Sequence, residues 1–167
     1  MQTLKTALCL ALGGTLLAGC ALLPPGLFQK KPGEEVTVRI YDEASAALPA
    51  ENRQTVEIPR TGLKLSINLF PTLTEQNVQS AELYDTAGGK GIFLRFDPHG
   101  TILLDEMTTR ARGQYFVVLI NNHPVSAWLV DQRIINGQFL IEGDFTDEDA
   151  KKVVDGLNEL SKKNNRP

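Results

Sequence analysis

The chain has 167 residues, of which 42% are hydrophobic, and its 17 Lys and Arg residues against 20 Asp and Glu residues give a formal net charge of -3. This length and apolar content predict one globular domain with a sizeable core, and they argue against a chain that is disordered throughout. The basic residues are dispersed and form no stripe, which argues against a nucleic-acid-binding surface.

Residues 1–19 show the three parts of a signal peptide. Lys5 supplies a positive start, residues 6–17 form a short apolar run, and Leu17-Ala18-Gly19-Cys20 closes the run with small residues before a cysteine. This last motif resembles the bacterial lipobox. The resemblance implies a diacylglyceryl group on the Cys20 thiol, cleavage before Cys20, and acylation of the new amino terminus, for example with palmitate. The alternative is an ordinary secretory signal with a chance cysteine.

The mature chain is expected to keep Cys20 as its only cysteine, because Cys9 lies in the apolar run that is removed. Residues 20–33 are rich in Pro and Gly and follow no regular period, which predicts a tether between the lipidated cysteine and the folded domain. Ala21 stands where enteric-type lipoproteins of the inner membrane carry aspartate. We therefore expect an anchor in the outer membrane, facing the periplasm, rather than in the inner membrane.

Residues 34–72 are predicted to form short strands. Val36, Val38 and Ile40 alternate with more polar residues, which is the two-residue period of a strand with one buried face. A second strand over 55–58 ends at a proline, and residues 63–69 show the clearest alternation in the chain. The pattern leaves open whether these strands form a small subdomain or extend the main sheet.

Residues 73–160 are predicted to form an α+β domain, in which an antiparallel-rich sheet has two helices packed on one face, and the N-terminal strands precede this domain. Asp97 is placed to cap the first helix, and Thr146 with Asp149 forms a variant capping box at the second. Residues 161–167 are expected to be a frayed tail. The predicted elements are a helical turn at 73–77, strands at 78–85 and 91–96, a helix from 98 that ends at 113, strands at 115–120, 125–130 and 138–142, and a helix that opens at 146 and runs to 160.

The strand at 115–120 is the centre of this prediction. Its sequence, Tyr-Phe-Val-Val-Leu-Ile, is continuously apolar, which indicates a strand covered on both faces. Asn121-Asn122 then predicts a tight hairpin turn, because both residues tolerate left-handed backbone. A further turn at Asn136-Gly137 leads to the strand at 138–142.

In their order, the motifs of residues 73–160 resemble the head subdomain of the first periplasmic domain of the protein-translocase subunit SecD. The sequence departs from the family at Asn121-Asn122, where the family has Asp-Gly, and at Trp128, where it has proline. No transmembrane segments follow, so the resemblance implies the fold and a non-catalytic role in handling exported polypeptide, without proton-coupled transport. The matching motifs are Leu73-Thr74, Ser80-Ala81, Phe96-Asp97, Val117 to Ile120, Val125-Ser126-Ala127-Trp128, Ile135-Asn136-Gly137, Ile141 to Thr146 and Asp149-Ala150.

The sequence shows no catalytic or metal-binding constellation. His99 and His123 have no partner at a recognisable spacing, so both are expected to be solvent-facing residues. Acidic residues gather at 144–149, where they suit the start of a helix and do not match the spacing of an EF-hand calcium loop. We expect no cofactor and no metal.

Trp128 is the main candidate for contact with a partner. It stands either in the core, packed within its strand, or on the sheet surface as an aromatic anchor for a partner or an extended peptide. Asn122, His123 and Tyr115 are the residues expected beside it in the second case.

These observations predict a lipid-anchored, non-enzymatic envelope protein whose SecD-head-like domain binds protein. The bound protein is an export substrate, a translocase subunit or another envelope assembly partner. One alternative is a structural or cell-surface lipoprotein with a repurposed fold and no polypeptide-handling role. The other is an envelope hydrolase, which requires a pocket that gathers Asp97, His99 and acidic residues from another element.

Overall fold

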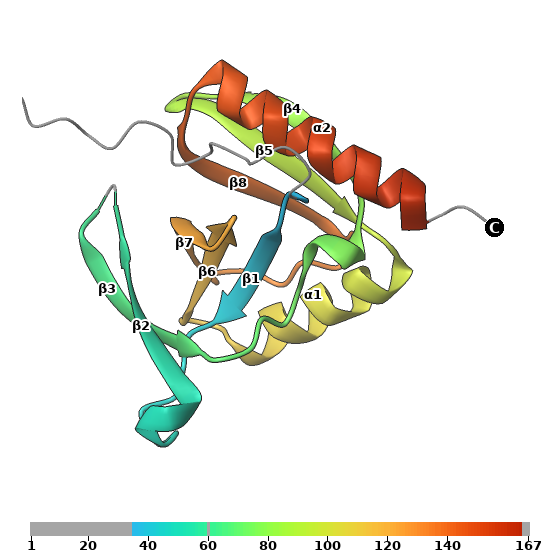
Figure 1. Ribbon diagram of the computed structural model, residues 1–167. Coiled ribbons are helices and arrows are strands. Elements are labelled where there is room, and N and C mark those ends of the chain that lie inside the picture. The colour runs from blue at the N-terminus through green and yellow to red at the C-terminus, as the bar shows by residue number, and fades with distance from the viewer. Residues whose placement is uncertain (1–34, 60, 165–167) are drawn as a thin grey trace, which may run out of the picture.

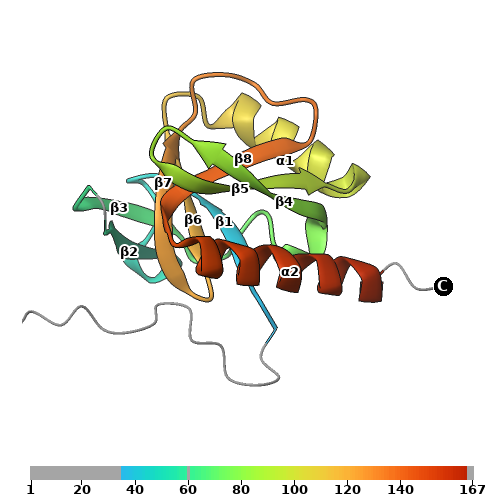
Figure 2. The ribbon, with the colours of Figure 1, turned by 90° about the horizontal axis from the view of Figure 1, so that it is seen from above.

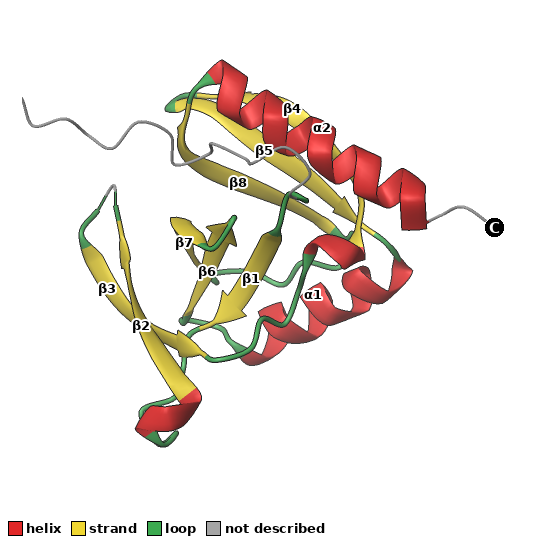
Figure 3. Ribbon diagram, in the orientation of Figure 1, coloured by secondary structure: helices red, strands yellow, loops and turns green. Residues whose placement is uncertain are grey.

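A computed structural model describes residues 35–59 and 61–164 of the chain. The predicted signal peptide, Cys20 and the tether at 20–33 lie outside these residues. Eight strands, two α-helices and two short 3-10 helices make up the described fold (Figure 1, Figure 3). Their bounds are β1 (Val38–Asp42), η1 (Ala50–Asn52), β2 (Arg53–Ile58), β3 (Leu63–Asn68), η2 (Glu75–Asn77), β4 (Val78–Thr86), β5 (Gly89–Phe96), α1 (Pro98–Arg110), β6 (Tyr115–Ile120), β7 (His123–Leu129), β8 (Gln138–Phe145) and α2 (Asp147–Asn164).

The strands form three antiparallel sheets, in the orders β1-β6-β7, β2-β3 and β4-β5-β8. Together with the two α-helices, they confirm the predicted α+β class with antiparallel pairing. The predicted single sheet is divided, however, because residues 130–137 carry the chain from β7 across to β5. β8 therefore pairs with β5 and not with β7.

One face of the β4-β5-β8 sheet is buried. Ile92 and Leu94 of β5, with Phe139 and Ile141 of β8, alternate with outward-facing residues and are at most 3% exposed. They share a hydrophobic cluster with side chains from both helices and from the β1-β6-β7 sheet. Both helices thus contribute to the core on the same face of this sheet, while its other face is not part of either core cluster (Figure 2).

The continuously apolar strand β6 lies between two clusters, as its sequence predicts. Phe116, Val118 and Ile120 belong to the large cluster, and Val117 and Leu119 belong to a smaller one that includes the inner side chains of the β2-β3 hairpin. Each of the five side chains is at most 4% exposed. The turn after β6 has positive φ at both asparagines, 49° and 66°, which is the backbone expected of a two-residue hairpin turn.

Helix α2 covers the outer edge of β4. The side-chain amide of Asn158 accepts a hydrogen bond from the backbone N–H of Ala81 and donates one to its carbonyl oxygen, both at 2.9 Å, and the Ser161 hydroxyl donates to the carbonyl oxygen of Gln79 at 2.6 Å. The side chains of α2 therefore take the place of a further strand along this edge (Figure 1).

This contact also extends the helix beyond its predicted end. The sequence pattern placed a frayed tail from residue 161, whereas α2 continues to Asn164. Ser161 is only 7% exposed because its hydroxyl is tied to β4. Residues 165–167 lie outside the described part of the chain.

The N-terminal strands divide between the two clusters. β1 pairs antiparallel with β6 and so completes that sheet, while β2 and β3 form a hairpin of their own that extends away from α2 (Figure 1). The chain enters the fold at Val36, which packs against α2. Within the described residues, no helix has the length and hydropathy needed to cross a bilayer.

The contact between Val36 and α2 generates a stability prediction. A Cβ added to Gly156 would lie 2.4 Å from Val36 Cγ2, which is closer than carbon atoms can pack. Gly156→Ala is therefore expected to lower the free energy of unfolding by about 1–3 kcal/mol through overpacking, although alanine is normally the better helix residue by about 1 kcal/mol. Urea unfolding of the mature chain measures the change.

The matched control adds Val36→Ala to the same chain, which makes room for the new methyl group. The double variant is expected to lose less stability than the sum of the two single variants, because the two residues are in direct contact. A Gly156→Ala variant as stable as the wild type would show that α2 does not hold this close approach.

Candidate functional site

The four predicted partner-binding residues do not lie together. Cross-strand pairing places Trp128 opposite Phe116 on one face of the β1-β6-β7 sheet, while Tyr115 pairs with Leu129 and packs on the other face, against the smaller cluster. Asn122 and His123 are exposed at the turn of the hairpin, at the far end from Trp128. Tyr115 is separated from Trp128 because it lies on the opposite face of the sheet, and Asn122 and His123 are separated from it by the length of the strand.

Trp128 is half-buried and joins two sheets. Its ring centroid lies 6.0 Å from that of Phe116 and 5.7 Å from that of Phe139, the latter in an edge-to-face arrangement that aromatic rings favour. Phe116 belongs to β6 and Phe139 to β8, so the indole bridges the β1-β6-β7 and β4-β5-β8 sheets. The sequence left core and surface roles open for this residue, and the structure combines them: one side packs on the core and the other lines a pocket.

This pocket, which we call the Trp128 pocket, has a volume of about 420 Å³. It lies between β8, Trp128 and the loop at 132–136, and Arg133 is the one charged residue in its lining. Its volume falls in the range of small ligand sites. The lining residues are Phe93, Trp128, Gln132, Arg133, Ile134, Ile135, Asn136, Gln138, Phe139 and Leu140.

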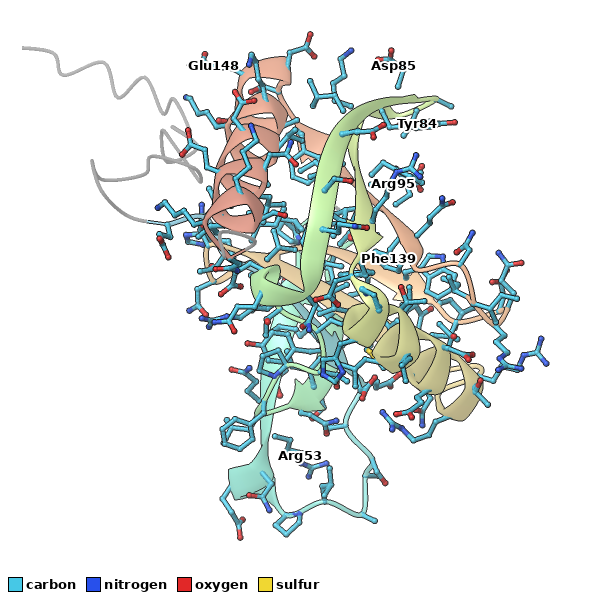
Figure 4. The ribbon with its side chains drawn as sticks, turned by 90° about the vertical axis from the view of Figure 1, so that its right-hand side faces the viewer. Arg53, Tyr84, Asp85, Arg95, Phe139 and Glu148 are labelled. Carbon is cyan, nitrogen blue, oxygen red and sulfur yellow. The ribbon has the colours of Figure 1, made fainter. Side chains whose placement is uncertain are left out.

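The pocket continues onto the outer face of the β4-β5-β8 sheet. We call this surface the open face and define it by Tyr84, Phe93, Arg95 and Leu140, which share one side of the sheet by register. The Tyr84 and Phe93 rings lie 6.1 Å apart, and the Arg95 guanidinium lies 5.4 Å from the Phe93 centroid, in the range of a cation–π contact. Tyr84 and Arg95 are labelled on this side of the sheet in Figure 4.

Sequence reasoning did not single out the open face. The run Gly91–Phe96 is almost continuously apolar, and in a sheet with one buried face its alternate residues must point outward. That signal could have identified Phe93 as an outward aromatic residue. Tyr84, which is 53% exposed, gave no comparable signal, because a single tyrosine near a turn is common.

An ion pair fixes the pocket loop to α1. The Arg133 guanidinium donates to both carboxylate oxygens of Asp105, one of them at 2.8 Å, and the Thr108 hydroxyl accepts a hydrogen bond from the backbone N–H of Ile134 at 3.0 Å. The hydrogen bond from Arg133 lowers the pKa of Asp105 below its ordinary value and raises the pKa of Arg133. Two neighbouring positions of the loop are therefore tied to the helix.

The two residues named for the hydrolase alternative lie at the start of α1, outside the pocket. The Asp97 carboxylate accepts a hydrogen bond from the backbone N–H of Gly100 and so caps α1, as the sequence predicts, while His99 is exposed on the first turn. Neither residue lines the Trp128 pocket. Within residues 35–59 and 61–164, no three His, Cys, Asp or Glu side chains are placed to hold a metal ion.

The fold and the site together define an α+β domain of antiparallel sheets, in which an open aromatic face leads into a pocket at one sheet edge. The family model described as "SecDF, P1 head subdomain" matches residues 51–159, more than half of the chain, and the chain belongs to this family. The resemblance noted in the sequence is thereby confirmed, and the match also takes in β2 and β3, which precede the motifs that carried it.

Two solved structures share the fold. One is described as "Crystal structure of SecDF in Super-membrane-facing form" and the other as "Structure and function of a membrane component SecDF that enhances protein export". Each has a TM-score of 0.59, is 18% identical in sequence and covers 75% of this chain. This chain spans 19% of the first and 63% of the second, less than two thirds of either. No curated protein matches the sequence.

The ion pair at the pocket loop generates a pH prediction. Because the folded pKa of Asp105 is lowered, the pair's stabilisation is present above the ordinary value of 3.8 and is lost as the pH falls through the lowered pKa. Arg133→Ala is expected to return the pKa of Asp105 toward 3.8, measured by NMR titration of its carboxyl carbon. Arg112→Ala, which removes a bond to the Asp131 carbonyl oxygen in the same loop, is the control and leaves the pKa in place. An unchanged pKa in Arg133→Ala would contradict the pairing.

Proposed function

We propose that this chain is a lipid-anchored protein of the cell envelope whose folded domain binds polypeptide without catalysing a reaction. The polypeptide is an exported protein or a component of the translocation or envelope-assembly machinery. Membership of the SecDF P1 head family supports this role, since one relative with this fold is described as a membrane component that enhances protein export. No enzyme chemistry is needed for it.

The observation that carries the proposal is the continuous path from the open face into the Trp128 pocket. Tyr84 is exposed and its ring neighbour Phe93 is half-buried, and the pocket beside them is large enough to admit a bulky apolar side chain. Aromatic residues supply much of the binding energy at protein interfaces, and an adjoining pocket gives one side chain of the partner a place to be buried. This combination suits a polypeptide with exposed apolar residues.

The proposed anchor sets where such binding takes place. Lipidation of Cys20 joins the chain to a membrane, and the thirteen residues from Ala21 to Gly33 reach at most about 45 Å when fully extended. The domain then meets its partners close to the membrane surface, on the periplasmic side of the outer membrane in our proposal. An exported polypeptide that approaches this membrane surface comes within this reach.

The anchor is tested by Cys20→Ser. Without the thiol, no lipid is attached, so the protein is expected to move from the membrane fraction to the soluble fraction and to lose incorporation of labelled palmitate. Cys9→Ser is the matched control, because Cys9 lies in the segment that is removed, and it is expected to keep both properties. Lipid anchoring would be overturned if the Cys20→Ser variant stays in the membrane fraction and the wild-type protein incorporates no labelled palmitate.

Polypeptide binding is tested with a short, unstructured, tryptophan-free peptide in which Val and Leu alternate with Thr. Trp128 is the single tryptophan of the protein, so its fluorescence reports binding at the pocket. Tyr84→Ser is expected to weaken binding about tenfold, because tyrosine is enriched among the interface residues whose truncation costs more than about 1 kcal/mol.

Phe70→Ser is the matched control. Phe70 is 77% exposed and follows β3, away from the open face, so its loss is expected to leave binding within about twofold of the wild type. A wild-type protein that binds no such peptide would overturn the proposed function. Equal weakening of binding by both variants would show that the open face is not the surface that binds the peptide.

A further inference from the structure

We infer that the bound polypeptide adds to the free edge of β8 as an extra strand and places one of its side chains in the Trp128 pocket. This inference rests on the proposed function and specifies how the binding occurs. It follows from the direction in which the backbone groups of each strand point.

The two hydrogen bonds from Asn158 fix these directions. They show that the N–H and C=O groups of Ala81 point away from β5. In an antiparallel ladder, the residue opposite Ala81, which is Leu94, then directs its own groups to the other side, toward β8. Leu94 pairs with Phe139 of β8, and the backbone groups of Phe139 point back toward β5.

The remaining residues of β8 follow by alternation. Phe139 and Ile141 use their backbone groups to pair with β5, whereas Leu140 and Glu142 direct theirs away from it. The side-chain amide oxygen of Asn136 accepts a hydrogen bond from the outward N–H of Gln138 at 3.1 Å, which agrees with this assignment. Among the described residues, no hydrogen bond reaches the outward groups of Leu140 or Glu142.

The sheet therefore has two unlike edges. At β4, α2 lies along the edge, and its side chains bond both outward groups of Ala81 and the carbonyl oxygen of Gln79. At β8, Glu142 is exposed, and the pocket opens beside Gln138 and Leu140. Unpaired groups on an exposed edge form a template for another strand, so the β8 edge accepts an extended backbone that the β4 edge does not.

The occupant is an extended polypeptide segment with apolar side chains at alternate positions. Added beside β8, it directs alternate side chains to opposite faces, one set toward Phe93 on the open face and the other toward Trp128. Arg133, the one charged residue in the lining, is already paired with Asp105, and the other lining residues are apolar or uncharged, so the pocket accepts an apolar side chain. The edge supplies affinity for any backbone, and the pocket selects the side chain.

The decisive variants are Glu142→Pro and Glu142→Ala in the mature chain. Both remove the same exposed side chain, but only proline removes the outward N–H, and proline is tolerated on an edge whose N–H faces solvent. With the alternating Val/Leu/Thr peptide, Glu142→Pro is expected to weaken binding about tenfold relative to Glu142→Ala. Hydrogen exchange gives a second measurement: the amides of Leu140 and Glu142 in the wild type are expected to become protected when the peptide binds.

Two N-methylated peptides complete the test. In a bound strand, every second backbone amide of the peptide faces β8 and the others face away, and each peptide carries methyl groups on one of these two sets. The peptide methylated on the set that faces β8 is expected to lose binding, and the other is expected to keep it. Equal binding by Glu142→Pro and Glu142→Ala, with no amide protection, would overturn strand addition while leaving polypeptide binding intact. A wild-type protein that binds none of the peptides, including the unmodified one, would overturn both the proposed function and this inference.

Discussion

The molecule depends on the burial of one face of the β4-β5-β8 sheet. A three-stranded sheet cannot be stable with both faces in water, so Ile92, Leu94 and Ile141 must be covered. Both helices and the β1-β6-β7 sheet contribute to that cover, and their side chains share one cluster. With all of these elements on the inner side, the outer side of the sheet is left to solvent. The open face is thus a consequence of how the core is built.

Much of the fold could be predicted from the sequence because its signals are local. Alternating residues located most strands, Asp97 and Thr146 marked the starts of the helices, and paired asparagines marked the hairpin turn. The division into separate sheets could not be predicted in this way, because β8 has the same local pattern whether it pairs with β7 or with β5. That choice is made by contacts between distant residues, such as Trp128 with Phe139.

The site was predictable in part for the same reason. Trp128 stood out as a single large aromatic residue on a strand, and it does line a pocket. Its predicted neighbours were chosen by closeness in the sequence, whereas residues that are adjacent along a strand point to opposite faces. The residues that do lie near Trp128 come from β5, from β8 and from a loop held by Arg133 and Asp105. That ion pair joins residues 28 positions apart and leaves no sequence pattern.

The place where the chain enters the fold has a mechanical consequence. Glu35 pairs with Lys163 at 3.2 Å, and Val36 packs against Gly156, so the described part of the chain begins beside the C-terminal half of α2. A force applied at Glu35 therefore acts first on these contacts with α2 and then on β1 and its pairing with β6, from Val38 onward. β1 belongs to the β1-β6-β7 sheet, whereas the open face belongs to the β4-β5-β8 sheet, whose β4 edge is bonded to α2. α2 is therefore the element that links the point where the described chain begins to the sheet that carries the open face.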